Sequence, residues 1–180
     1  IAFLDEVFKA NSAILNALLT LLNEREFDNG AGRLRVPLIS VVGASNEPPA
    51  DESLLAFHDR FLLRVPVSPV SDAKFGALLT LGGEPPAMAA APIGAAERAA
   101  IAARCGTVAL GADALAALGA LRGFARQHEL PVSDRRWRQL VGLLRCAALT
   151  EGRSQVDALD LWLAPYVVSH DVDAVPRVAA

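Results

Sequence analysis

The stretch Ile1-Ala2-Phe3-Leu4-Asp5-Glu6 decides the fold, because four apolar residues run directly into two adjacent acids. An uninterrupted apolar run of this length is typical of a strand buried on both faces of a parallel sheet. Side chains at the carboxyl end of such a strand face the ligand crevice of an open α/β sheet. The two acids predict either a site for a metal-bound nucleotide or an acidic cap on the next helix, and the stretch alone leaves both interpretations open.

Strand and helix signals alternate along the first 70 residues. Asn11 or Ser12 is suited to cap a helix that ends near Arg25, and Asp28-Asn29-Gly30 predicts a hairpin with a type I′ turn. The elements expected here are strand 1–4, helix 12–25, return strand 33–36, strand 38–44, short helix 51–58 and strand 61–67. Because apolar strands alternate with helices, we predict an α/β fold with a mostly parallel sheet that is covered on both faces.

From Ser71 onward the pattern changes to helices alone. Helices are expected over residues 72–81, 95–104, 112–128, 133–151 and 156–168, and an alanine- and proline-rich linker over 82–92. Trp137 and Trp162 are interpreted as residues of core or interdomain packing. The predicted division is a partial α/β core at 1–70, a helix and linker at 71–94, a small all-α domain at 95–168 and a tail at 169–180.

The composition excludes several classes of protein. Hydrophobic residues make up 53% of the 180 residues and charged residues 21%, which excludes a disordered chain. The longest stretch without a charged residue, Ala10 to Asn23, is too short to cross a bilayer. With a net charge of −3, the chain lacks the basic surface that is typical of a nucleic-acid-binding protein. Cys105 and Cys146 stand in no metal-ligand spacing, so we interpret them as two buried thiols of a cytoplasmic protein.

Three polar residues gain interest from their positions relative to the acid pair. Asn46 follows the strand expected at 38–44, and its amide would reach the same water or phosphate if the two strands are neighbours; otherwise it is an ordinary turn residue. Arg60 lies between a helix and a strand, where it is either a surface residue or an arginine finger that acts on a neighbouring subunit. Arg64 is the competing finger, although it falls inside the expected strand.

A second group of arginines opens the helix expected at 133–151. Arg135, Arg138 and Arg145 share one helical face, which could contact phosphates. The residues alone favour a solvated face instead.

The chain contains no P-loop. That motif requires a Gly-Lys-Ser/Thr sequence, and neither of the two lysines, Lys9 and Lys74, follows a glycine. Together with a first residue that already reads as strand interior, this predicts a piece of a longer protein or a catalytically dead chain.

Residues 1–16 closely resemble the Walker B segment of MoxR-type AAA+ ATPases, and Phe8-Lys9-Ala10-Asn11 points to the RavA-like subgroup. Other segments resemble further motifs of that family in the same order. These are 23–30 for the helix end and hairpin, 43–47 for the sensor 1 strand, 55–64 for the arginine-finger segment, and 132–137 with 152–154 for the lid helix that carries sensor 2. The resemblance extends from Ile1 to about Val168.

The resemblance implies a fold and a set of site residues. The fold would be the C-terminal half of a P-loop AAA+ αβα core followed by an all-α lid. The implied roles are Mg²⁺ binding for Asp5, water activation for Glu6, sensor 1 for Asn46, action on the neighbour's ATP for Arg60, and sensor 2 for Arg135 with Arg136 as the fallback.

The resemblance also implies an ATP-hydrolysing ring, usually a hexamer, that remodels or activates protein substrates in a chaperone-like way. Such rings often work with a von Willebrand factor A-domain protein. Without a P-loop, the chain by itself is expected to hydrolyse no ATP. Two alternatives remain open. One is a non-catalytic module that docks on ATPase rings and supplies Arg60 in trans. The other is a DNA-acting relative, which the acidic balance and the lack of an aromatic–basic strip disfavour.

Overall fold

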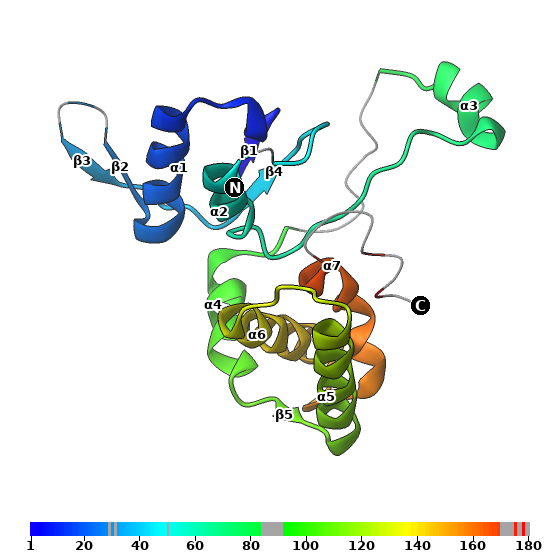
Figure 1. The fold of residues 1–180 in the computed structure, drawn as a ribbon. Coiled ribbons are helices and arrows are strands. Elements are labelled where there is room, and N and C mark those ends of the chain that lie inside the picture. The colour runs from blue at the N-terminus through cyan, green and yellow to red at the C-terminus, as the bar shows by residue number, and fades with distance from the viewer. Residues whose placement is uncertain are drawn as a thin grey trace. The chain divides into compact units, whose positions relative to one another are not determined.

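The computed structural model describes residues 1–28, 30, 32–49, 51–83, 92–169, 175 and 178. The chain divides into two compact units, Ile1–Leu62 and Leu63–Ala180, called here the N-terminal and the C-terminal unit (Figure 1). Most of the linker expected over 82–92 lies outside the described residues. The segment boundaries at 70, 94 and 168 stay predictions.

Two parallel strands form the sheet of the N-terminal unit. β1 (Ala2–Leu4) pairs with β4 (Val41–Gly43), with Leu4 opposite Gly43, so the expected apolar strands are confirmed as parallel neighbours. Phe3 and Val42 are paired and are 65% and 50% exposed. Because paired residues of adjacent strands point to the same face, one face of this sheet is not covered by the described chain. The expectation of cover on both faces is therefore wrong for the part described.

Both α-helices described in the N-terminal unit begin with a side-chain cap, and of the two caps expected for the first helix, Asn11 and Ser12, Asn11 is the one observed. Asn11 Oδ1 accepts a hydrogen bond from the backbone N–H of Ile14 at the start of α1 (Ser12–Glu24), and Asp51 Oδ1 accepts one from Leu54 at the start of α2 (Glu52–His58). A short 3₁₀ helix, η1 (Val7–Lys9), joins β1 to α1. The core of this unit is formed by Val7, Leu15, Leu54 and Phe57.

Two expectations for this part of the chain are wrong in detail. The hairpin of β2 (Glu26–Asp28) and β3 (Arg33–Arg35) forms, but Asp28 pairs with Arg33. This register leaves a four-residue connection, whereas a type I′ turn has two central residues. The strand expected at 61–67 does not form, since these residues pair with no other strand within the described ranges. An apolar run becomes a strand only where a neighbouring strand accepts its backbone hydrogen bonds.

The C-terminal unit is mainly helical. Its elements are α3 (Asp72–Leu79), α4 (Ala95–Cys105), β5 (Ala109–Leu110), α5 (Ala112–Gln127), α6 (Asp134–Thr150), β6 (Gln155–Val156), η2 (Ala158–Leu163) and α7 (Pro165–Val168). The central helix is α6, which contacts α4, β6, η2 and α7. Its buried residues Leu140, Leu144 and Ala148 face this core. None of the helices in the described ranges is long and apolar enough to cross a membrane.

The last predicted helix, 156–168, is wrong as a continuous element. A two-residue parallel bridge between β5 and β6, a 3₁₀ helix and one short α-helix occupy this region. Asp157 caps η2 through the backbone N–H of Leu159, and Pro165 lacks the N–H that a continuous helix would need. Trp162 is 64% exposed, so it is not a core residue of the C-terminal unit as described, whereas its interdomain packing stays a prediction.

Candidate functional site

The acid pair and Asn46 meet beyond the carboxyl ends of β1 and β4. Two backbone hydrogen bonds, from Ala44 N to Leu4 O and from Val7 N to Ala44 O, extend the pairing of the two strands past their last residues. The loops that follow are thereby held side by side. Asn46 Nδ2 donates a hydrogen bond to Glu6 Oε1 at 3.0 Å, although 40 residues separate them in sequence. The structure thus brings together the two residues that sequence reasoning linked only conditionally.

The backbone of Glu6 adopts an unusual conformation. Its φ of 50° and ψ of 40° lie in the left-handed helical region, which non-glycine residues rarely occupy. The backbone N–H of Glu6 donates to Asp5 Oδ1 at 3.0 Å. Such conformations cost free energy and persist only where the surrounding structure holds them. They are found most often at functional sites.

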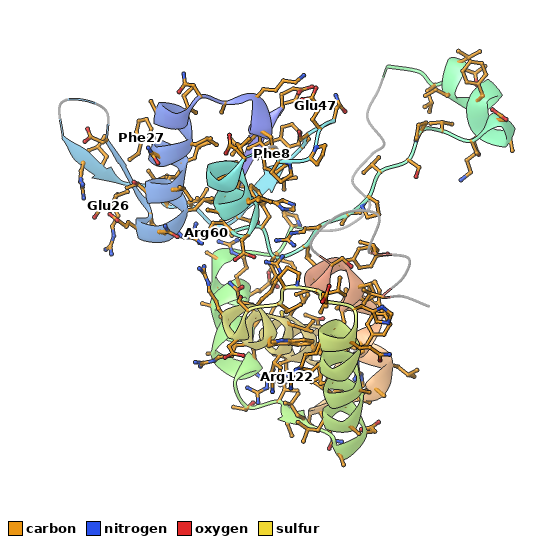
Figure 2. The ribbon with its side chains drawn as sticks, in the orientation of Figure 1. Phe8, Glu26, Phe27, Glu47, Arg60 and Arg122 are labelled. Carbon is orange, nitrogen blue, oxygen red and sulfur yellow. The ribbon has the colours of Figure 1, made fainter. Side chains whose placement is uncertain are left out.

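Lys9 completes the cluster and was not singled out from the sequence. Its Nζ lies 2.8 Å from Glu6 Oε2 and 3.9 Å from Glu47 Oε1, and Glu47 is labelled in Figure 2. The ion-pair contact with Lys9 is the main cause that lowers the pKa of Glu6, and the same contact raises the pKa of Lys9. Glu6 is therefore a carboxylate at neutral pH, with one oxygen on Asn46 and the other on Lys9.

Asp5 is exposed next to this cluster. A carboxylate is the kind of oxygen ligand that Mg²⁺ takes, and magnesium is commonly bound through one or two carboxylates together with nucleotide phosphates. The residues at this edge of the sheet therefore fit a magnesium–nucleotide complex, with Asp5 as the protein ligand and Glu6 beside it.

The two finger candidates differ in what they contact. Arg60 Nε donates to Asn23 Oδ1, in the last turn of α1, at 3.1 Å. Arg64 belongs to the C-terminal unit, where its Nη1 donates to the carbonyl oxygen of Ser169 at 2.8 Å and its backbone N–H donates to Tyr166. Arg64 therefore ties a loop to the end of α7, which favours Arg60 as the candidate finger.

The two sensor 2 candidates also differ. Arg136 is 2% exposed, and its Nε donates to the carbonyl oxygen of Val167 at 2.6 Å, so it joins α6 to α7. Arg135 is exposed in the first turn of α6, which Ser133 caps through the N–H of Arg136. A side chain that contacts a nucleotide must be accessible, so the burial of Arg136 favours Arg135.

Arg153 is a structural residue of the C-terminal unit. Its guanidinium binds both carboxylate oxygens of Asp160, which is 4% exposed, and also the carboxylates of Glu151 and Asp157. The hydrogen bonds from Arg153 hold the pKa of Asp160 below its ordinary value. This network fixes the loop after α6 onto η2. The sequence alone does not reveal it, because no local pattern shows which acids a loop arginine meets.

The two cysteines lie beside each other in the C-terminal unit. Both are free and half-buried, and the Cys105 thiol, at the end of α4, interacts with the Cys146 thiol of α6. Burial is the main cause that raises the pKa of Cys105, and the neighbouring Cys146 adds to it. Their separation of 41 positions in sequence (146 minus 105) gives no sign of this proximity.

Comparisons with known proteins identify the family of this chain. A family model described as the MoxR domain in the MoxR-vWA-beta-propeller ternary systems matches residues 1–101, and a model of the AAA lid domain matches residues 113–179. Two uncharacterised proteins of Methanocaldococcus jannaschii are similar. One is 37% identical over 176 residues, or 97% of this chain and 46% of the relative. The other is 67% identical over 64 residues, or 36% of this chain and 17% of the relative.

A solved structure shares the fold. The crystal structure of a "putative ATPase" from Cytophaga hutchinsonii matches 97% of this chain and 60% of its own chain, with a TM-score of 0.64 and 14% identity. The chain spans less than half of the length of the curated relatives it matches. The fold is therefore a portion of an α/β AAA+ core followed by a helical lid. Since the MoxR model matches 101 of the 180 residues, this chain belongs to the MoxR family of AAA+ proteins.

Proposed function

We propose that this chain forms the Walker B, sensor 1, arginine-finger and lid portion of an ATP-hydrolysing MoxR-type ring. The observation that carries the proposal is the hydrogen bond of 3.0 Å between Asn46 and Glu6, beyond the carboxyl ends of two adjacent parallel strands. Ligands of open α/β sheets bind at this edge. The strained backbone of Glu6 at the same place supports the proposal.

Each residue has a role in this proposal. Asp5 holds Mg²⁺, which neutralises charge on the phosphates of bound ATP. The Glu6 carboxylate orients the attacking water and accepts its proton. Asn46 keeps the Glu6 carboxylate in place and is itself within reach of the same water. Arg60 acts on ATP bound to the adjacent subunit, and Arg135 of the lid contacts the nucleotide.

The P-loop of this site comes from a segment outside the 180 residues, since the chain itself contains no Gly-Lys-Ser/Thr. The proposed assembly is a homo-oligomeric ring, a hexamer, with ATP and Mg²⁺ as cofactors. Chaperone-like action on protein partners is proposed with it. A von Willebrand factor A-domain protein is the proposed partner, because the matching family model describes MoxR-vWA-beta-propeller systems. The RavA-like subgroup remains a proposal supported by Phe8-Lys9-Ala10-Asn11.

The test is a Glu6→Gln variant of the full-length protein that carries this chain and a P-loop. We expect nucleotide binding to persist and the rate of steady-state phosphate release to fall by at least about 100-fold, because general base catalysis contributes roughly 10²–10⁴ in rate. Glu47→Gln is the matched control. Glu47 is an acid of the same cluster, but it lies farther from Lys9, at 3.9 Å, than Glu6 does, at 2.8 Å. Unchanged phosphate release by Glu6→Gln would overturn the proposal.

A further inference from the structure

Arg60 is held by a side chain from another element. Its Nε donates to Oδ1 of Asn23 at 3.1 Å, and 37 residues separate the two in sequence. Within the part of the chain that the structure describes, the Arg60 guanidinium makes this one side-chain hydrogen bond. Its Nη1 and Nη2 atoms have no partner among the described residues. Arg60 is labelled in Figure 2.

The backbone around Arg60 is also fixed. The N–H of Arg60 donates to the carbonyl oxygen of Phe57, and Phe57 is fully buried. The next residue, Phe61, packs edge-on against Phe57, with ring centres 5.3 Å apart. A Cβ atom on Gly43 would lie 3.0 Å from the Phe61 ring, so the ring lies closely over the end of β4. The start of the Arg60 side chain is therefore set by the core, and Asn23 orients its far end.

The chemistry of the Asn23 contact suits an arginine that must act elsewhere. A guanidinium is planar, so a single hydrogen bond at Nε restricts the orientation of the whole plane. The remaining edge, Nη1 and Nη2, is the fork that binds phosphate in a bidentate manner. Asn23 is uncharged, so it leaves the positive charge of Arg60 intact, whereas a carboxylate at the same place would neutralise it.

We propose that Asn23 is a positioning residue for Arg60, which it orients so that Nη1 and Nη2 reach the γ-phosphate of ATP on the adjacent subunit. The inference rests on the proposed function, in which Arg60 is the arginine finger. Asn23 lies in the last turn of α1, where the partial negative charge of the helix C-terminus also attracts a cation. The two effects hold Arg60 in one orientation before a neighbouring subunit arrives.

The experiment compares single variants of the full-length protein that carries this chain and a P-loop. The variants are Arg60→Ala, Asn23→Ala, Asn23→Asp and Asn16→Ala. Asn16 is an exposed asparagine two turns earlier on α1 with no described side-chain contact, which makes it the matched control. Steady-state phosphate release gives kcat and KM for ATP, and thermal melting checks that each variant folds.

We expect Asn23→Ala to lower kcat about fivefold with KM unchanged, which is the factor of one hydrogen bond. Asn23→Asp keeps an acceptor beside Nε and pairs with Arg60. If the contact were merely structural, this variant would therefore retain the original kcat. We expect it to lower kcat further, by at least about tenfold, because the ion pair neutralises the finger. Arg60→Ala should lower kcat by roughly 10³ or more. Asn16→Ala should match the unmodified protein.

Two failures can be told apart. If Arg60→Ala leaves kcat unchanged, Arg60 is not the finger and that part of the proposed function falls together with the inference. If Arg60→Ala abolishes phosphate release while Asn23→Ala and Asn23→Asp retain the original kcat, the finger stands and the positioning role of Asn23 is overturned. That role is also overturned if Asn23→Ala lowers kcat only as far as Asn16→Ala does.

Discussion

Replacing two glycines of the C-terminal unit by alanine should have opposite effects on its stability. Gly111, the residue before α5, is buried, and its N–H donates to the carbonyl oxygen of Val156 in the β5–β6 bridge. A Cβ atom there would lie 2.5 Å from Gln155 Nε2 and 2.8 Å from that same carbonyl oxygen. Gly119 lies inside α5, is exposed, and a Cβ atom on it would meet nothing within 4 Å.

The magnitudes follow from these two environments. Gly111→Ala must move a backbone carbonyl that belongs to the bridge, which costs about 1–3 kcal/mol, and alanine is also a poorer N-cap than glycine. We therefore expect its free energy of unfolding to fall by about 2 kcal/mol. Gly119→Ala removes the conformational freedom of an interior helical glycine from the unfolded chain and should raise the free energy of unfolding by about 0.5–1 kcal/mol.

Urea unfolding followed by tryptophan fluorescence measures both changes. Trp137 and Trp162 are the two tryptophans of the chain and both belong to the C-terminal unit, so the signal reports on that unit. With a slope of about 1–3 kcal/mol per molar urea, Gly111→Ala should lower the midpoint by about 1 M. A midpoint for Gly111→Ala at or above that of the unmodified chain would refute this reasoning, as would a large drop for Gly119→Ala.

Three further predictions concern charges, thiols and catalysis. Arg153 lowers the pKa of Asp160 in the folded state. The stability that the Asp160 carboxylate contributes is therefore present above the ordinary aspartate pKa of about 3.9, and it is lost as the pH falls through the lowered pKa of the folded state. Asp160→Asn should therefore be less stable at pH 7 and show a flatter loss of stability in acid, as measured by thermal melting against pH; an unaltered profile would contradict this. Because burial raises the pKa of Cys105, iodoacetamide should alkylate it more slowly at pH 8 in the folded chain than in urea, as followed by mass spectrometry, and equal rates would count against the structure. The 180-residue chain by itself should release phosphate from ATP no faster than buffer, since it carries no P-loop; release that depends on Glu6 would show this prediction to be wrong.

The local elements were largely predictable because their signals lie within a few neighbouring residues. The apolar run before Asp5 predicted β1, Asn11 or Ser12 with the apolar spacing after them predicted α1, and Ser133 predicted the start of α6. These patterns act through hydrophobic periodicity and capping hydrogen bonds, both of which are set by short sequence separations. The predictions were wrong where an element depends on contacts with distant residues. The strand expected at 61–67 and the helix expected at 156–168 are the two cases.

The sequence by itself therefore determined the order of the motifs and the types of residue at the candidate site: the acid pair, Asn46, Arg60 and Arg135. The tertiary structure alone decided which atoms meet. The hydrogen bond from Asn46 to Glu6 depends on the parallel register of β1 and β4, and the contact of Arg60 with Asn23 depends on how α1 lies beside the segment after α2. Likewise, the packing of α6 against α7 buries Arg136 and leaves the adjacent Arg135 exposed. These outcomes arise from contacts between residues far apart in the chain, and no local pattern of side chains encodes their geometry.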